Sequence, residues 1–396
     1  MDREWKIEEA EEVIKRYRIR EAEEVIKGCI GSKGIWPSPG LTDYRYQYFT
    51  RDYAIGGLYG LLEIGRQDVA RKHLSNLAQH QHDDGHLSIV LYDEPYKVLF
   101  QKLVRLMKEP SRIRKIGKHL PLLAGRSSTD NLTPHTTDSE LHYIDAFRTY
   151  ETLTGDTTLS DEYPDSIEHA LAFAETNIRD GLFRGGDWRD NVRFLKKTEK
   201  WNNNVREPED VALLSNNALL YHVYNLLGLK DKAKPLRDEI TKKFWNGEYY
   251  TDHPETDSFD TLGQALVVRW GIADEGQYRS IIKQFEKMLT PYGFKANNLV
   301  MPECTGEEKK TNKRVNQYGT IWPHAMGNAI LALEKMGAHA LGVGGFERWN
   351  QLKGFREWYN PLTGYGGGAK RQMWSAALYL NVERGLGSLE RSQWHS

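Results

Sequence analysis

The chain has 396 residues, of which 39% are hydrophobic and 11% aromatic, so it can bury a large core and intrinsic disorder is excluded. Its 54 basic and 55 acidic side chains leave a net charge of −1, which argues against a nucleic-acid or membrane partner. No apolar run reaches the roughly 20 residues that span a bilayer. With only two cysteines, Cys29 and Cys304, a disulfide framework is excluded and a reducing, cytoplasmic location is predicted.

The first predicted element is a charged amphipathic helix over residues 1–28, a pattern unlike that of a signal peptide. Helical periodicity continues to the C-terminus, and strand signals are scarce. In a recurring pattern, an apolar helix ends at Gly and a short turn leads into the next helix. The pattern recurs at residues 59–74, 148–163, 224–240, 267–282 and 332–346. About twelve helices are therefore expected, as helical hairpins repeated around a ring in an all-α fold.

Polar loops rich in Gly, Trp and Asp separate these hairpins. They span residues 31–50, 83–95, 126–137, 184–208, 293–321 and 357–371. In a closed ring, such loops meet over the axis at one end, and functional residues tend to lie on loops held by a rigid scaffold. No linker interrupts the pattern, so a single domain over 1–396 is predicted. The basic amphipathic segment 93–125 is interpreted as a helical lid or excursion, with a membrane-touching or partner helix as the alternative.

Two acidic residues flank a tryptophan in the loop RGGDWRDN at 184–191. Trp188 lies between Asp187 and Asp190, and an indole beside a carboxyl group can desolvate it and raise its pKa. A raised pKa is what a general acid requires. The alternative interpretation is an Asx turn followed by a polar loop.

A third acidic candidate, Glu357, lies in the aromatic and Gly-rich stretch 355–374. The glycine run 366–368 beside Lys370 and Trp374 suggests a backbone packed against a ligand. The alternative is a helix end followed by a Gly-rich connection. Two carboxyl groups on separate loops are what glycoside hydrolysis needs, one as acid and one as base or nucleophile.

The aromatic cluster YQYFTRDYAIGG at 46–57 contains Tyr48 and is interrupted by Arg51 and Asp52. Asp52 is predicted either to cap the helix that starts there or to bind sugar hydroxyls, which a carboxylate accepts in pairs.

Two further loops allow the same double interpretation. Asp138 and Glu140 lie in TTDSELHY, which could be a capping box before a helix. Trp322 and His324 lie in QYGTIWPHAMG, where Pro323 could be a first-turn proline.

The histidine-rich stretch HQHDDGH at 80–86 matches no metal-ligand spacing, so no metal site is predicted. No phosphate-binding or dinucleotide fingerprint occurs, and no cofactor is predicted.

Taken together, FTRDY, TDSEL, DWRDN followed by SNNALLY, QYGTIWP, and EWYNPLTG with AKRQMWSAALYL resemble a known clan. The chain resembles the (α/α)₆-barrel glycoside hydrolases that include neutral/alkaline invertases. The glucosidase domain of glycogen-debranching enzymes and the processing α-glucosidase / mannosylglycerate hydrolase group are similar as well. The motifs keep their order from about residue 36 to 380, which is specific for the clan but not for one member.

The resemblance implies a toroid of helical hairpins with long loops over one end. It also implies Asp190 as general acid, Asp187 as runner-up or sugar ligand, and Glu357 as general base. An inverting mechanism follows, with the two carboxyl groups roughly 6.5–9.5 Å apart. Substrate contacts are predicted at Trp36, Tyr48, Arg51, Asp52, Asp138, Glu140, Trp188, Asn217, Trp322, His324, Lys370 and Trp374.

The sequence departs from the invertase pattern at Asn191, Trp358 and Asn360, and the stretch 192–210 has no counterpart in it. Sucrose therefore cannot be assumed as the substrate.

The leading hypothesis is an inverting, exo-acting glycosidase for a short α-glycoside: a disaccharide such as sucrose, an α-glucoside, or a glycosylated small acid. One alternative is a sugar epimerase or isomerase on the same barrel, with histidines such as His142 and His324 as acid and base. Another is a catalytically inactive carbohydrate-binding protein. A small saccharide is the predicted partner, and the glycone, the aglycone and the oligomeric state stay open.

Overall fold

The computed structural model describes residues 2–41, 43–93, 137–189, 211–299 and 319–393, together with the short stretches 97, 100, 103–104, 194–195 and 205–206. Helices dominate this part of the chain, as predicted for an all-α protein. None of the described helices is long and apolar enough to cross a membrane. Asp190 and most of segment 93–125 lie outside the described residues, so their predictions stay untested.

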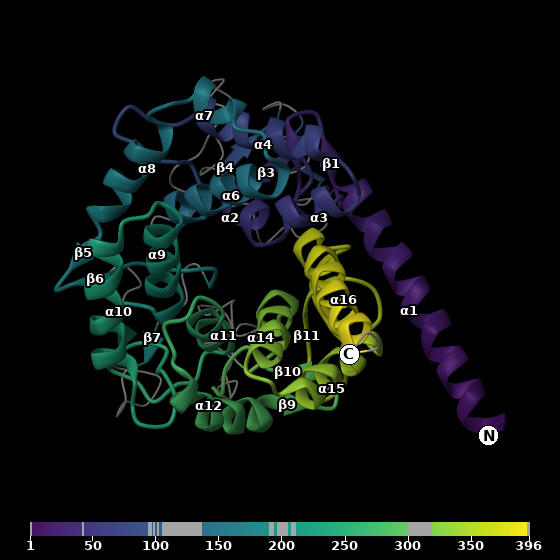
Figure 1. The fold of residues 1–396 in the computed structure, drawn as a ribbon. Helices are drawn as coiled ribbons and strands as arrows, with labels where there is room; N and C mark the ends of the chain where they lie inside the picture. The colour runs from purple at the N-terminus through teal and green to yellow at the C-terminus, as the bar shows by residue number, and fades with distance from the viewer. Residues whose placement is uncertain are drawn as a thin grey trace.

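An inner ring of helices surrounds the axis of the molecule (Figure 1). It consists of α2 (Thr50–Asp52) continuing through the π-helical turn η1 (Tyr53–Gly57) into α3 (Leu58–Glu63), α6 (Ser139–Thr154), α9 (Leu214–Leu226), α11 (Thr261–Arg269), α14 (Pro323–Lys335) and α16 (Met373–Gln393). Each inner helix contacts the next in this order, and α16 contacts η1 and α3. The last contact closes the ring.

Outer helices pack around this ring (Figure 1). They are α1 (Asp2–Gly28), α4 (Gln67–Gln79), the short α7 (Thr158–Glu162) with α8 (Ser166–Glu175), α10 (Lys230–Phe244), α12 (Glu275–Met288) and α15 (His339–Asn350). In α4, α8, α10 and α12, apolar residues recur on the face that packs inward, as in an amphipathic helix. Inner and outer helices thus form the predicted (α/α)₆ barrel.

The glycines that were predicted to end helices adopt the left-handed conformation that favours Gly. Their φ angles lie between 69° and 76° at Gly65, Gly155, Gly228, Gly271 and Gly337. Because the following helix starts within a few residues of each glycine, successive helices run antiparallel, and all inner helices run in one direction.

Short antiparallel strand pairs lie within the connections between helices. They are β1 (Ile30–Gly31) with β2 (Gly34–Ile35), β3 (Gln47–Phe49) with β4 (Val90–Tyr92), β5 (Ile178–Arg179) with β6 (Leu182–Phe183), β7 (Phe194–Leu195) with β8 (Val205–Arg206), β9 (Leu289–Thr290) with β10 (Gly293–Phe294), and β11 (Arg356–Tyr359) with β12 (Gly366–Lys370). Most of these strands lie in or beside the predicted polar loops, and none was predicted, because strands of two to five residues are too short for a period-2 pattern.

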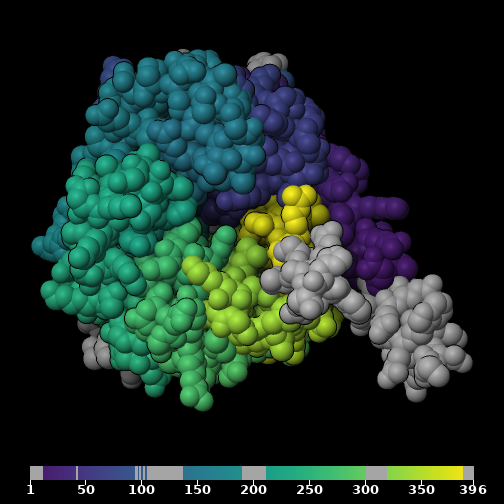
Figure 2. Space-filling model, viewed as in Figure 1, coloured from purple at the N-terminus to yellow at the C-terminus, as the bar shows by residue number. Residues whose placement is uncertain are grey.

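The ring is hollow at its centre on the face shown in Figure 2, between segments coloured blue, teal, green and yellow. The C-terminal end of α16 lies on this face (Figure 1). The hollow is therefore at the ends of the inner helices, opposite to their first turns.

Candidate active site

The predicted motifs meet at the barrel end where the inner helices begin. Arg51 on α2 reaches Asp138 at the start of α6, and Trp322 at the start of α14 lies against Trp374 at the start of α16. The parallel direction of the inner helices explains this convergence, because it places all their first turns at one end. Loops far apart in the sequence are thus brought to one site.

Arg51 and Asp138 form a buried ion pair. Arg51 Nη2 donates to Asp138 Oδ1 at 2.6 Å, and Nε donates to Oδ2 at 3.0 Å. His142 Nε2, one turn further along α6, lies 3.5 Å from Asp138 Oδ2. Burial alone would raise the pKa of Asp138, but Arg51 and His142 lower it to about 2. The carboxylate is therefore ionised at neutral pH. The predicted capping box is absent: the Thr137 hydroxyl donates to the Arg184 carbonyl, and Glu140 accepts from Leu87 N.

Asp187 belongs to a second buried charge network. Arg189 Nη2 donates to Asp187 Oδ2 at 2.7 Å and to Asp252 Oδ1 at 2.8 Å, and Ser215 Oγ donates to Asp187 Oδ2 at 2.7 Å. Burial raises the pKa of Asp187, but the charge and donors of Arg189 outweigh burial, and the pKa lies below its usual value. The expectation of a raised pKa beside Trp188 is therefore wrong for Asp187. As an ionised group, Asp187 is unsuited to be the general acid.

A third carboxyl group, Asp260, adjoins this network and was not singled out from the sequence. Its Oδ2 accepts from Gly263 N at 2.7 Å and caps α11, whereas its buried Oδ1 has no partner within the described residues. Burial raises the pKa of Asp260 to about 7. Arg189 lowers this pKa, and the nearby carboxylates of Asp252 and Asp187 raise it further. Nothing in the local sequence around Asp252 and Asp260 indicates that Asp252 shares a guanidinium with Asp187 or that Asp260 lies beside this pair.

Glu357 lies on β11 and is half-buried. Its Oε2 accepts from Ala369 N at 2.8 Å, and its Oε1 accepts from the Tyr44 hydroxyl at 3.2 Å. Gly368, on the paired strand β12, has φ 65°, and a Cβ there would overlap Glu357 Oε2. The hairpin thus holds the predicted base through neutral donors and a glycine that leaves room for it.

The glycine run 366–368 has a role in the packing of the hairpin. Side-chain atoms at Gly366 and Gly367 would overlap Arg356 and Trp358 of the neighbouring strand. The run therefore lets β12 pack against side chains of β11, and a ligand against its backbone stays a prediction. The side chain of Lys370, at the end of β12, is exposed.

Three tryptophans surround His324. The ring of Trp188 lies 4.5 Å from His324 and 4.9 Å from Trp322, and Trp374 lies 4.7 Å from His324. Burial lowers the pKa of His324 to about 3, so the imidazole is neutral. Neither ring nitrogen of His324 has a partner in the described part of the chain. Pro323 occupies the first turn of α14, as its alternative interpretation predicted.

Trp36 and Tyr48 pack against each other with ring centroids 6.3 Å apart. Tyr48 is fully buried, and its hydroxyl accepts from Lys33 N at 3.1 Å. This position gives Tyr48 a structural role, and its prediction as a sugar contact is not supported. Trp36 is 7% exposed, and its buried Nε1 has no partner among the described residues.

Two other predicted contacts are used by the protein itself. Glu140 Oε1 accepts from Leu87 N at 2.9 Å and lies 2.8 Å from His86 Nδ1, so it holds the preceding loop. The Asn217 amide donates to the carbonyls of Phe183 and Leu213 and accepts from Phe183 N, so the prediction of a sugar contact there is wrong. Leu87 and Phe183 are 53 and 34 residues away from these side chains in the sequence, so the sequence could not show these hydrogen bonds.

Asp52 lies inside the continuous α2–η1–α3 unit and makes no capping bond, so the helix-cap interpretation is wrong. It is half-buried and accepts from Gln372 Nε2 at 3.4 Å. Among the described residues, no group of three His, Cys, Asp or Glu side chains could hold a metal ion.

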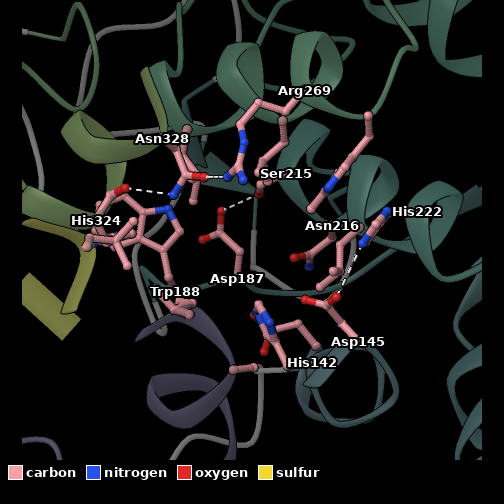
Figure 3. A pocket seen from close by; sticks show the side chains of 18 of the residues that line it. His142, Asp145, Asp187, Trp188, Ser215, Asn216, His222, Arg269, His324 and Asn328 are labelled. Atoms are coloured by element: carbon pink, nitrogen blue, oxygen red, sulfur yellow. Dashed lines mark hydrogen bonds and ion pairs between the residues drawn. The ribbon is translucent and has the colours of Figure 1, made fainter. Parts of the chain in front are cut away.

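A cavity runs along the barrel axis below this end (Figure 3). Of the predicted residues, Asp138, Asp187, Trp188 and His324 line it. Side chains of Ser215, on α9, and Asn328, on α14, point into it beside them. Glu357 is not among its lining residues.

Comparison with known proteins gives structural matches but no sequence matches. No family model and no curated protein matches the chain. GH63 mannosylglycerate hydrolase from Thermus thermophilus, in complex with Tris and D-glycerate, superposes with a TM-score of 0.64 at 16% identity. The match covers 92% of this chain and 99% of that one. The chain has the fold of the (α/α)₆-barrel glycoside hydrolases.

Two glycosidase structures agree with this assignment. A wild-type glycosidase has a TM-score of 0.63 at 13% identity, and a glycosidase variant in complex with glucose has 0.64 at 12%. Each match covers 96% of this chain and 98% of the other. The resemblance inferred from the ordered motifs, which included the mannosylglycerate hydrolase group, is confirmed.

Proposed function

We propose that this protein is an inverting, exo-acting glycoside hydrolase that cleaves a short α-glycoside, such as a disaccharide, another α-glucoside or a glycosylated small acid. The observation that carries the proposal is Glu357, held by Tyr44 and the Ala369 amide at the loop end of the barrel. The solved neighbours on this fold include a mannosylglycerate hydrolase with D-glycerate and a glycosidase with glucose. D-glycerate is a small acid and glucose is a sugar, so both could form part of the proposed glycosides.

In the proposed mechanism, Asp190 protonates the glycosidic oxygen while Glu357 removes a proton from the attacking water. The Ala369 amide and the Tyr44 hydroxyl donate to the Glu357 carboxylate and orient it. The ion pair between Arg189 and Asp187 holds the loop segment that directly precedes Asp190. Asp52, Asp138 and the tryptophans are proposed to hold the glycone, and no cofactor is needed.

Sugar release followed by NMR tests this function. The panel contains sucrose, trehalose, isomaltose, maltose, glucosylglycerate and mannosylglycerate, and the anomer released first reports the stereochemistry. We expect one inverted sugar, with release abolished in Glu357→Gln and Asp190→Asn. Wild-type rates in Asp190→Asn would remove Asp190 from the role of acid. The exposed Asp180→Asn serves as the control.

A sugar epimerase or isomerase is the second candidate, because His142 and His324 both line the axial cavity. Against it, a histidine whose pKa is lowered to about 3 is a weak base for removing a proton from carbon. Incubation in D₂O separates the two: an isomerase incorporates deuterium at a carbon of the sugar, and a hydrolase does not. Saturable sugar binding with neither reaction would indicate the inactive binding protein.

A further inference from the structure

The axial cavity has a mouth at the barrel end opposite to the loops. Its lining continues from Asp187 and Trp188 to Arg269, the last residue of α11, and to Asn381 on α16. The empty space within the cavity, including the part open to solvent, is about 760 Å³. Figure 2 shows the corresponding hollow at the centre of this face. No role in the proposed hydrolysis uses this mouth.

Polar groups of opposite charge face each other across the mouth. Arg269 donates to the Asn328 side chain, and it forms no ion pair within the part of the chain described. Asp145 Oδ1 lies 3.3 Å from His222 Nε2 and accepts from the Thr149 hydroxyl. The other cavity carboxylates, Asp138 and Asp187, are each paired with an arginine. Among the cavity residues, Asp145 and Arg269 are thus the carboxylate and the guanidinium without an arginine or carboxylate partner, and their opposite charges offset each other at the mouth.

Aromatic rings and a buried imidazole complete the lining. His222 stacks on Trp270 with centroids 4.4 Å apart and an interplanar angle of 4°. At the inner end, His324 is fully buried and both its nitrogens lack partners among the described residues. Figure 3 shows His222 and His324 on opposite walls of the cavity, with Arg269 between them.

We propose that this mouth binds a neutral monosaccharide or polyol, at a second site separate from the catalytic one. Hydroxyl groups both donate and accept, so they match a carboxylate, a guanidinium and amides placed together. An anion would meet Asp145, and a cation would meet Arg269. The apolar faces of a sugar ring match the Trp270 wall. Trp188 and His324 line the inner end of the cavity, and Glu357 is not among its lining residues.

Alkylation of a cysteine placed in the mouth tests the proposal and requires no turnover. Asn381→Cys is made in a Cys304→Ser background, and its rate with N-ethylmaleimide is measured with and without D-glucose. Burial raises the pKa of Cys29, so this thiol contributes little background. We expect saturating glucose to slow alkylation at least ten-fold, and gluconate to have no effect. Gln351→Cys, on the exposed surface, is the control whose rate stays unchanged.

Adding Arg269→Gln or Asp145→Asn should remove the protection, and adding Glu357→Gln should leave it intact. The last variant separates this site from the proposed active site, because it removes the base without touching the mouth. Equal alkylation rates with and without glucose would overturn the proposal, and so would stronger protection by gluconate. If Asn381→Cys does not fold, calorimetric titration of wild type and Arg269→Gln with glucose replaces it, and an unchanged number of sites would overturn the proposal.

Discussion

The two acidic regions at the loop end of the barrel hold their carboxyl groups in opposite ways. In the first region, the buried guanidinium of Arg189 forms ion pairs with the carboxylates of Asp187 and Asp252. Around Glu357, a backbone amide and a tyrosine hydroxyl orient a half-buried carboxylate. The difference teaches that acidic residues in similar sequence surroundings can be held by a charge network in one loop and by a backbone amide and a hydroxyl in another.

The largest expected effect is on turnover in Glu357→Gln. The amide oxygen can still accept from Ala369 N, so the fold should survive, but the group can no longer take a proton. We expect kcat to fall by about 10²–10⁴-fold. Steady-state kinetics and a thermal melt measure the two properties. Turnover close to wild type would show that Glu357 is not the catalytic base.

Arg189→Met tests the opposite region. It leaves Asp187 and Asp252 as buried carboxylates without their common cation, which should lower the free energy of unfolding by about 3–5 kcal/mol. Urea unfolding measures the loss. Arg66→Met, which breaks an exposed pair with Asp68, is the matched control and should cost less than about 1 kcal/mol. A similar loss in both variants would contradict a structural role for the network.

Gly368→Ala sharpens the account of the hairpin. The left-handed φ costs about 1 kcal/mol for alanine, and the added Cβ pushes Glu357 out of place. A displacement near 1 Å can reduce turnover by about 10²-fold. Gly337→Ala has the same backbone strain with no atom nearby, and its kcat should not change. Equal kcat in the two variants would show that Gly368 does not position the base.

The last predicted effect concerns Asp260 and depends on pH. Because its pKa is raised in the folded state, its protonated form stabilises the fold fully below about pH 4, and this stabilisation is lost as the pH rises through about 7. Asp260→Asn keeps an oxygen for the α11 cap and removes the titration. Its stability relative to wild type should therefore increase from pH 4 to 7. A difference independent of pH would contradict the raised pKa.

Local chemistry made much of the fold predictable. Helical periodicity and the glycines that end helices depend on neighbours along the chain, so the sequence indicated the repeated hairpins. The first-turn motifs around Arg51, Asp138 and Trp322 were recognised for the same reason. The short strands were missed because two to five residues are too few for a period-2 pattern, and β3 and β4 also pair across 40 intervening residues.

By itself, the sequence determined the helical class, the hairpin repeat and the set of loops that carry the candidate site, because periodicity and capping are local properties. Only the tertiary structure decided which acids are available for chemistry. Arg189 forms ion pairs with Asp187 and with Asp252, 63 residues further along the chain than Arg189, and Asn217 is hydrogen-bonded to the distant backbone of Phe183. Charge compensation and burial depend on distances in space, so no local pattern could reveal them.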